Sequence, residues 1–420
     1  MTPVAPLRSM RAEILSVGTE LLLGQITDTN AAYIARELAA LGIDVFFKQT
    51  AGDNPQRIQD SLRLALSRAD AVLITGGLGP TEDDLTVDAV ARALGEDLVE
   101  DPAVVEHVRR FFAARGRTPT ANVFKQALVP RTARVIPNTR GTAPGIHLER
   151  DGRMIFIMPG VPYEMEAMMR EYVIPVLRTR TTGEVIRSVV LRVTGEGESA
   201  VEMRIKDLLA NTTPTIAPYA KLGEVHLRLT AKGQADAVAR QLAHGEELVR
   251  ERLGDLIYGK DDESLEEIVG RTLTARRETL AVAESCTGGL LAQRLTTVPG
   301  SSAYFIEGIV AYSDEAKVSL LEVPQALLEA HGAVSAPVAE AMAQGIRTRA
   351  GTTYALSITG VAGPSGGTEE KPVGLVYLGL AGGDGAQHRR LTFGSQPARV
   401  GIRHLAAQAA LNLLRLHLLE

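Results

Sequence analysis

The chain has 420 residues, which is more than one ordinary domain holds, so we expect two or three compact units. Hydrophobic residues make up 45% and charged residues 23% of the sequence, a balance typical of globular rather than disordered proteins. A net charge of −5, 4% aromatic residues and the lack of tryptophan argue against a non-specific nucleic-acid binder, which usually carries a basic excess and aromatic stacking surfaces.

The cellular location is indicated by the cysteine content and the apolar runs. Cys286 is the single cysteine, which excludes an intramolecular disulfide and suits a reducing compartment. There is no run of eighteen apolar residues that would predict a membrane span, and residues 1–11 lack the apolar core of a signal peptide. This opening segment is typical of a frayed tail, in which Met10 is an alternative start. We therefore expect a cytoplasmic protein.

From Ala12 onwards, short β-rich runs alternate with longer helical stretches, the pattern of an α/β sheet with crossover helices. Asp28 or Thr29 is able to cap the first helix, which should end at Gly42. A first domain is predicted over 12–177. Its strands are expected at 12–18, 43–50, 71–77, 145–150 and 154–158, and its helices at 28–42, 55–69 and 162–177.

Two loops of this domain follow strands and are rich in glycine, hydroxyl and acidic residues. SVGTELLLGQITDTN (16–30) follows the first strand, and TGGLGPTEDDLT (75–86) follows a later one. Because parallel strands gather their loops at their carboxyl ends, we expect both loops to face one crevice. Main-chain N–H groups of the second loop could wrap phosphates, and Asp83 and Asp84 could hold a divalent cation that bridges them.

This loop pair is neither a Walker A motif, because no GK[ST] follows, nor a dinucleotide fingerprint. The competing interpretation of TEDD is an acidic helix N-terminus, which the helix dipole favours with or without a ligand. NTRGTAPG (138–145) and MPGVPYEM (158–165) add two further turn-rich loops.

The polar segment RTRTTG (178–183) breaks the periodicity and marks a domain boundary. Beyond it we predict a small β-α-β-α unit over 180–257, without a catalytic constellation. KDDES (260–264) is expected to be an acidic hinge, and Ser264 with Glu267 predicts a capping box for a helix over 265–277. The strands of the small unit are expected at 185–195 and 224–233, and its helices at 198–210 and 234–253.

A second complete α/β domain is predicted over 262–420. Its strands lie in LAVAES, FIEGIVAYS, YALSITG, VGLVYLGLAG and HRRLTF, with helices between them and a closing helix. The predicted fold class is therefore α/β, with two three-layer α/β domains joined by a small α+β linker domain.

AESCTGG (283–289) lies where a strand should end and a helix begin. Such a corner leaves N–H groups of the first helical turn unpaired, so that Ser285 would lie beside an oxyanion or phosphate cradle. Gly288 and Gly289 would let a substrate approach the main chain. The competing interpretation is that Ser285 is an ordinary helix N-cap.

A serine nucleophile needs a base, and no histidine follows in a triad-like context. YSDEAK (312–317) offers Tyr312 and Lys317 instead. A lysine acts as a base only if burial or positive neighbours depress its pKa toward neutrality. A Ser–Lys dyad is one possibility here; a solvated helix lysine is the other.

SITGVAGPSGGTEEKPVG (357–374) is a strand end that runs into a long glycine-rich loop. Thr359 and the main chain around Gly360 to Gly363 suit hydrogen bonding to a polar ligand or phosphate. Taken alone, this segment is more typical of a flexible surface loop.

Together, ESCTGG and TGxAGPxGGxxxKPVG resemble the nicotinamide mononucleotide deamidase domain at the C-terminus of the competence/damage-inducible protein A (CinA) family, over roughly 262–420. The resemblance implies Ser285 as nucleophile, Lys317 as general base, Tyr312 and Thr359 in assisting roles, and Arg399 at the substrate. The implied reaction converts nicotinamide mononucleotide to nicotinic acid mononucleotide and ammonia without a cofactor. Two positions depart from the family pattern: LEV (321–323) replaces the usual LGV, and Asp314 replaces the usual Asn.

The four N-terminal loops resemble the molybdopterin-binding-like domain of the same family, over about 12–175, and the middle unit resembles its linker domain. The resemblance implies hydrolysis of the pyrophosphate of ADP-ribose with Mg²⁺, Mn²⁺ or Co²⁺, and a homodimer. Besides Asp83 and Asp84 as metal ligands, the candidate binding residues are Thr19, Glu20, Asn30, Gly76, Gly77, Gly79, Thr81, Lys125 and Thr142.

Three hypotheses follow. The first is a bifunctional pyridine-nucleotide salvage hydrolase whose partners are small nucleotides, with no membrane and no nucleic acid. The second is an N-terminal module that binds a molybdopterin-type cofactor without pyrophosphatase activity, since fold does not fix function. The third is a non-enzymatic role in DNA uptake or repair, which the charge balance disfavours.

Overall fold

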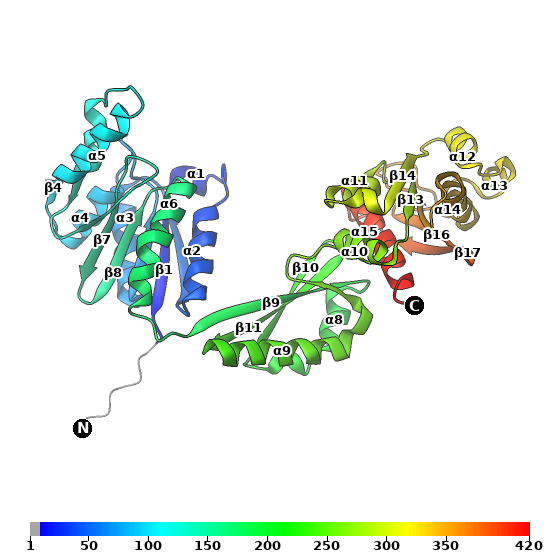
Figure 1. The fold of residues 1–420 in the computed structure, drawn as a ribbon, viewed down its shortest axis with the longest axis horizontal. Coiled ribbons are helices and arrows are strands. Elements are labelled where there is room, and N and C mark those ends of the chain that lie inside the picture. The colour runs from blue at the N-terminus through cyan, green and yellow to red at the C-terminus, as the bar shows by residue number, and fades with distance from the viewer. Residues whose placement is uncertain (1–8) are drawn as a thin grey trace. The chain divides into compact units, whose positions relative to one another are not determined.

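The computed structural model describes residues 9–420, so residues 1–8 of the expected frayed tail lie outside the described part (Figure 1). The chain forms two compact units, one made of the chain through Arg187 with 231–241, the other of 188–230 with 242–420. Residues of the expected linker, 180–257, divide between these two units. The three domain boundaries therefore stay a prediction.

The N-terminal sheet has six strands in the order β2-β1-β3-β8-β7-β6. The first four run parallel, and β7 and β6 are antiparallel at one edge. The loops after β1, β3 and β8 therefore meet at one edge of the sheet. The bounds are β1 Arg11–Val17, β2 Asp44–Ala51, β3 Ala71–Thr75, β6 Arg134–Ile136, β7 Gly145–Arg150 and β8 Arg153–Met158.

Both faces of this sheet are buried, because successive side chains of a strand point to opposite sides. Ile14 packs against α2 (Thr29–Ala40) and α6 (Pro162–Met168), whereas Leu15 packs against α3 (Pro55–Arg68) and α4 (Thr86–Leu94). This confirms a three-layer α/β arrangement (Figure 1). Asp28 caps α2 as predicted, since its carboxylate accepts from Ala31 N at 2.9 Å.

Several N-terminal elements differ from the expectation. The helix predicted over 162–177 is interrupted by a π-helical turn at Met169–Val173 before α7 (Ile174–Arg178). Pro175 lies just after that turn and has no N–H to donate to the preceding turn, which accounts for the irregularity. The sequence did not predict α1 (Thr19–Leu22), α4, β4 (Leu98–Glu100), α5 (Pro102–Ala113), a 3₁₀ helix at Ala121–Ala127, β5 (Leu128–Pro130) or β6.

The middle of the chain forms a four-stranded sheet in the order β10-β11-β9-β12. The predicted β-α-β-α pattern was wrong in omitting β10 and β12, and the helix expected over 198–210 ends at Arg204. Pro218 weakened the strand signal of β10, but β10 is an edge strand, where proline is tolerated. The bounds are β9 Val185–Thr194, α8 Glu198–Arg204, β10 Thr215–Lys221, β11 Glu224–Gly233, α9 Ala235–Leu253 and β12 Ile257–Lys260.

The segment expected to be an acidic hinge is instead bound to β9. Asp261 N donates to Val190 O at 2.7 Å, and Val190 N donates to the Asp261 carboxylate at 3.0 Å. Lys260 also forms an ion pair with Glu246 at 2.7 Å. These contacts continue the strand pairing, so 260–264 is not a free hinge.

The C-terminal sheet has five strands in the order β14-β13-β15-β16-β17. β13, β14 and β15 are parallel, and β16 and β17 are antiparallel. The chain therefore leaves three neighbouring strands at the same edge, at Glu284, Val310 and Gly360. The strands are β13 Leu280–Glu284, β14 Phe305–Val310, β15 Tyr354–Gly360, β16 Leu375–Gly382 and β17 Gly385–Thr392.

Helices cover both faces of this sheet, which confirms the second three-layer domain. Val282 packs with α10, α11 and α15, whereas Ala283 packs with α12, α13 and α14. The predicted capping box of Ser264 and Glu267 begins α10. The helices are α10 Leu265–Arg276, α11 Leu290–Thr297, α12 Asp314–Leu321, α13 Gln325–His331, α14 Ala336–Ala350 and α15 Arg399–His417.

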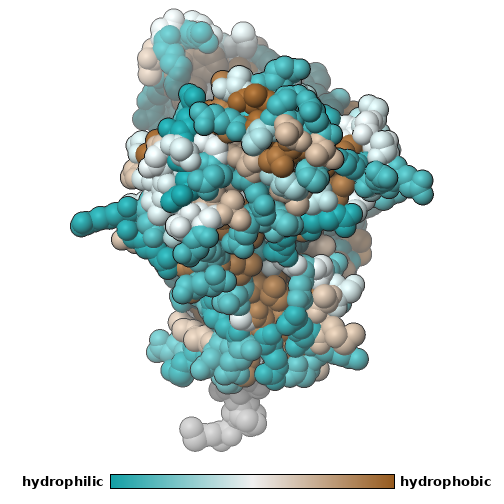
Figure 2. Space-filling model, turned by 90° about the vertical axis from the view of Figure 1, so that its right-hand side faces the viewer, coloured by the Kyte–Doolittle hydropathy of each residue, from teal (hydrophilic) through white to brown (hydrophobic). Residues whose placement is uncertain are grey.

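The face of the molecule drawn in Figure 2 is mostly hydrophilic, with hydrophobic residues in small groups among the polar ones. Across residues 9–420, none of the helices is both long enough and apolar enough to cross a membrane.

Candidate functional sites

Ser285 lies at the end of β13 and is 9% exposed. Its N–H donates to Ile358 O at 2.9 Å, which ties the corner to β15. Gly288 and Gly289 have φ values of +58° and +92°, backbone conformations that favour glycine. The corner predicted from AESCTGG is therefore a tight turn that leads directly into α11.

The prediction that the N–H groups of the first turn of α11 are unpaired is wrong, whereas a cradle beside Ser285 stays a prediction. The buried Glu284 carboxylate accepts from the N–H groups of Gly289, Leu291 and Ala292 at 3.1, 3.0 and 2.8 Å. A carboxylate at a helix N-terminus satisfies these donors and the helix dipole together. Next to Ser285, the main-chain N–H groups of Cys286 and Thr287 donate to no other residue within 9–420.

Lys317 lies on α12 and is 1% exposed. Its Nζ donates to the carbonyls of Tyr312 and Ser313 at 3.2 and 3.3 Å. Burial lowers the pKa of Lys317, while the Asp314 carboxylate, 3.7 Å away, opposes this shift. The alternative of a solvated helix lysine is therefore wrong. This amine has the buried environment that a lysine base requires.

Ser285 and Lys317 lie at the same edge of the sheet, although no hydrogen bond joins their side chains anywhere in residues 9–420. Ala311 N donates to Glu284 O at 2.9 Å, so the chain that leads into α12 starts beside the Ser285 corner. The Cys286 thiol, next in sequence to Ser285, is among the groups that act on the pKa of Lys317. The dyad itself stays a prediction.

Arg399 joins two of the other predicted segments. Its guanidinium donates to Gly363 O and to the Tyr312 hydroxyl, both at 2.8 Å. Tyr312 is exposed, so this pair lies at the solvent side of the corner. The glycine-rich loop is thereby connected to the segment that leads to Lys317.

Thr359 and Gly360 are engaged within the protein. Thr359 is buried and its hydroxyl donates to Ala333 O at 2.8 Å. A Cβ at Gly360 would lie 2.7 Å from a methyl group of Val376, so close strand packing also requires glycine there. The structure places both residues beside the corner.

Sequence reasoning missed Glu284 and Arg403. Arg403 donates twice to Thr287 O and lies one turn after Arg399 on α15. The spacing of four residues between the two arginines was the available signal, since it puts them on one helix face. Burial raises the pKa of the Cys286 thiol to about 11, as expected for a packed residue rather than a nucleophile.

The N-terminal unit has a cleft of about 460 Å³ beyond the carboxyl ends of its parallel strands. Two side lobes, of about 120 and 250 Å³, share lining residues with it. Glu20 and Gly160 line the first lobe as well as the cleft, and Gly79 and Gln126 line the second as well as the cleft. The three spaces therefore lie next to one another.

Most of the predicted N-terminal residues line the main cleft. They are Glu20, Gly76, Gly77, Gly79, Asp83, Asp84 and Thr142. Asn30 and Lys125 line the smaller and the larger side lobe, and Lys125 donates to Thr81 O at 2.8 Å. Thr19 and Thr81 bind neighbouring carboxylates instead: Thr19 donates to Asp53 and Thr81 to Asp84.

The main cleft is strongly acidic. Its five carboxylates are accompanied by no lysine, arginine or histidine among the lining residues. In the described part of the chain, no group of three or more His, Cys, Asp or Glu residues is arranged to hold a metal ion. Mg²⁺ is usually held by only one or two carboxylates together with substrate phosphates and waters. Asp83 and Asp84 fit a site with so few protein ligands. Gly79 packs against one of them, since a Cβ at Gly79 would lie 2.4 Å from Asp84 Oδ2.

Three cleft residues were not predicted as ligands. Asp53 follows β2, Glu164 lies at the start of α6, and Gln126 donates to Leu78 O at 3.0 Å. Asn138 donates to the Glu164 carboxylate at 2.7 Å and fixes it in the cleft. The sequence predicted MPGVPYEM as a turn-rich loop, and the acidic residue Glu164 within it could have been identified as a candidate ligand.

Three segments of the chain match protein families. Residues 13–179 match a probable molybdopterin binding domain, 188–259 the damage-inducible protein CinA KH domain, and 262–418 the CinA C-terminal domain. The chain is 52% identical to a competence-damage inducible protein of Moorella thermoacetica, over 96% of this chain and 98% of that one. It is 49% identical to a CinA-like protein of Nostoc sp., over 98% of this chain and 100% of that one. A solved structure, the protein CinA with unknown function from Thermoplasma acidophilum, is 36% identical with a TM-score of 0.37, over 39% of this chain and 95% of that one.

Proposed function

The chain belongs to the competence/damage-inducible protein (CinA) family, and from that premise we propose that it is a bifunctional hydrolase of pyridine nucleotides. The C-terminal domain hydrolyses the carboxamide of nicotinamide mononucleotide to nicotinic acid mononucleotide and ammonia. The N-terminal domain hydrolyses the diphosphate of ADP-ribose. The buried Lys317 amine beside the Ser285 corner carries the first assignment.

Hydrogen bonding makes Lys317 suitable as a base. A neutral amine has two N–H donors and one lone pair, and two carbonyls accept from Nζ. The lone pair then takes the proton of the Ser285 hydroxyl while Oγ attacks the amide carbon of the substrate. That proton leaves with the ammonia, and water hydrolyses the ester to return Ser285 and the carboxylic acid.

Charge that develops on the amide oxygen needs donors that are not already used. Because Glu284 occupies the first turn of α11, we assign this role to the N–H groups of Cys286 and Thr287. Arg399 and Tyr312 lie at the exposed side of the corner, where a substrate phosphate would meet the guanidinium.

Release of ammonia from nicotinamide mononucleotide by the purified full chain tests this assignment. Ser285→Ala is expected to lower the rate by at least about 10³-fold, because the covalent step is lost. Ser302→Ala, in the exposed turn before β14, is the matched control and should keep the wild-type rate. A Ser285→Ala variant as fast as the control would refute the proposal.

The acidic N-terminal cleft supports the second assignment. A diphosphate cannot enter five carboxylates without a counter-cation, so substrate and divalent metal would bind together. Asp83 and Asp84 would hold the metal, which supplies charge neutralisation at the diphosphate. The flanking lobes would take the adenosine and the ribose ends, with Asn30 and Lys125 among their lining residues.

Hydrolysis of ADP-ribose with Mg²⁺, Mn²⁺ or Co²⁺ tests this half. Asp84→Asn should lower the rate by about 10²-fold or more, whereas Asp60→Asn, exposed on α3 and outside the lining of the cleft and its lobes, should change it little. The match to a probable molybdopterin binding domain supports one alternative, a module that binds a pterin cofactor without cleaving diphosphates. Binding of a molybdopterin precursor, without ADP-ribose turnover with any of these metals, would favour that alternative.

The remaining assignments are part of the same proposal. Cytoplasmic location rests on the single, buried Cys286, and the homodimer rests on family membership. No nucleic acid is proposed as partner, since the net charge is −5.

A further inference from the structure

A cavity of about 340 Å³ lies in the second unit, apart from the Ser285 corner. One wall consists of the 194–198 loop with the facing ends of β10 and β11, and the other of β17 and α15. Its volume falls within the range of small-molecule sites, about 300–1,000 Å³. We infer that this cavity binds a 5′-mononucleotide, and the inference is independent of either proposed activity.

Two cations at the cavity are free to bind an anion. Lys221 and Arg389 both line it and are exposed. Within residues 9–420 neither side chain has a hydrogen-bonding or ion-pairing partner, whereas most arginines of this chain are paired. Three glutamates also line the cavity: Glu196 is paired with Arg204, Glu224 with Gln408 and His226, and Glu198 lies at the start of α8. Because two of these carboxylates are already paired, the two unpaired cations remain for a phosphate monoester, which carries about −1.5 to −2 charges near neutral pH.

Asn412 supplies a donor inside the cavity. Its side chain is 5% exposed, and its Oδ1 accepts from Arg415 Nε at 3.0 Å. Its Nδ2 faces Gly195 across the cavity and donates to nothing in the described chain. This amide N–H₂ is therefore free to donate to a ring nitrogen or carbonyl of a ligand in the cavity.

The wall beside these polar groups is apolar and accepts a flat ring. Leu391, Phe393 and Leu405 line it, together with Val225 from the opposite side. Base recognition commonly combines such a surface with a few fixed polar groups. The combination of ring surface, amide donor and two unpaired cations matches base and phosphate of one nucleotide.

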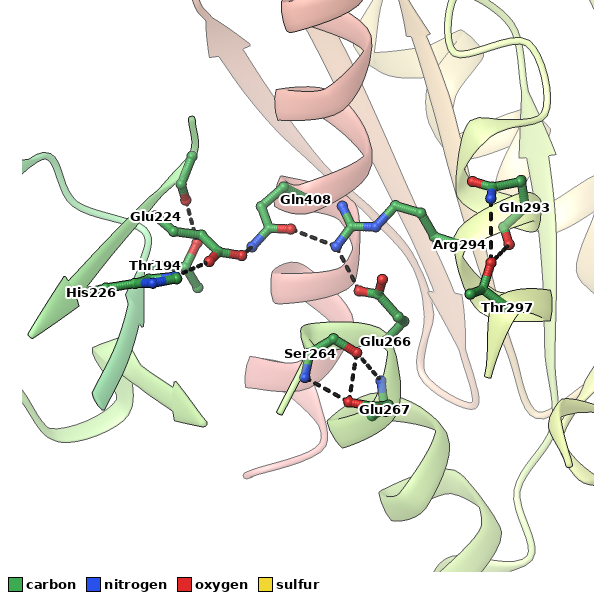
Figure 3. A network of polar contacts seen from close by, with 11 residues as sticks. Thr194, Glu224, His226, Ser264, Glu266, Glu267, Gln293, Arg294, Thr297 and Gln408 are labelled. Carbon is green, nitrogen blue, oxygen red and sulfur yellow. Dashed lines mark hydrogen bonds and ion pairs between the residues drawn. The ribbon is translucent and has the colours of Figure 1, made fainter. Parts of the chain in front are cut away.

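A polar network holds this cavity in shape (Figure 3). Glu224 on β11 accepts from Gln408 on α15 at 2.8 Å and contacts His226 at 2.7 Å. Gln408, only 2% exposed, accepts in turn from Arg294 on α11 at 2.7 Å. Because these contacts join three separate elements, the two walls have a fixed spacing before any ligand binds.

Photolabelling of the full chain with 8-azidoadenosine 5′-monophosphate, followed by peptide mapping, tests the inference. Label is expected on residues within 389–393, 405–412 or 220–225, which line the cavity, and not on 394–404, which include Arg399 and Arg403 of the Ser285 corner. Excess 5′-AMP should compete, and adenosine, which lacks the phosphate, should compete much more weakly. Label confined to other segments, or equal competition by adenosine, would overturn it.

Two neighbouring arginines provide matched variants. Arg389→Gln should lower labelling of these peptides by about fivefold, because an exposed charge pair contributes roughly 1 kcal/mol to binding. Arg390 points to the opposite face of β17 and does not line the cavity, so Arg390→Gln should label like the wild type. Both side chains are exposed, so neither change threatens folding. Equal labelling of the two variants would contradict the assignment.

Discussion

Replacement of Glu284 by glutamine tests how the Ser285 corner is built. The Glu284 carboxylate is 1% exposed and accepts three main-chain N–H groups at 2.8–3.1 Å. Glutamine keeps the shape but removes the charge and one acceptor oxygen. Its N–H₂ group would face donors, so at least one N–H of the α11 first turn would lose its partner.

The size of the effect follows from these contacts. Hydrogen bonds to a charged group contribute about 1.5–3 kcal/mol each, and a buried donor left unpaired costs about 1–3 kcal/mol. We therefore expect Glu284→Gln to destabilise the C-terminal domain by about 2–4 kcal/mol. For a domain of this size that corresponds to a fall in Tm of roughly 5–15 °C.

Differential scanning calorimetry of the full chain measures this effect. Glu307→Gln is the matched control, because Glu307 forms only an exposed ion pair with Arg349, which contributes about 0–1 kcal/mol. The reasoning fails if both variants unfold within about 1 °C of the wild type. In that case the three N–H groups would not depend on the carboxylate.

Two further predictions concern the departure at Asp314 and the first cleft loop. The Asp314 carboxylate opposes the lowering of the pKa of Lys317, so Asp314→Asn should lower that pKa further. The acidic limb of the pH–rate profile for ammonia release should then move to lower pH. A move to higher pH would contradict this sign. Gly77→Ala, at φ +66° with its Cβ 2.2 Å from Thr86 Oγ1, should cost about 2–4 kcal/mol in urea unfolding. Gly95→Ala, at φ +69° with no atom within 4 Å, should cost about 1 kcal/mol, and equal costs would show that the contact with Thr86 is unimportant.

The sequence predicted the two α/β domains because their central strands β1, β3, β8, β13 and β15 are buried on both faces and appear as continuous apolar runs. It also predicted which loops lie together, since the loops of parallel strands share one edge. The short N-terminal strands β4, β5 and β6 were missed, because three residues give no readable periodicity. β10 was missed because Pro218 weakens the strand signal, although an edge strand tolerates it.

The chemistry of the corner depends on contacts that no local pattern contains. Glu284 is the last residue of an apolar strand, and only the turn through Gly288 and Gly289 brings its carboxylate under α11. DEAK looks like the exposed start of a helix, yet packing against the rest of the domain leaves Lys317 1% exposed. Burial of a lysine depends on the tertiary fold. The sequence could therefore only state that a lysine base needs a lowered pKa, and the fold shows the burial that lowers it.

The central claim is that Ser285 and Lys317 act as one unit on nicotinamide mononucleotide. A double-mutant cycle of ammonia release tests it most directly, with Ser285→Ala, Lys317→Met and the double variant in the full chain. Groups that act together are strongly non-additive, so the double variant should be no slower than the slower single variant. Losses that multiply, or a wild-type rate in either single variant, would contradict the claim.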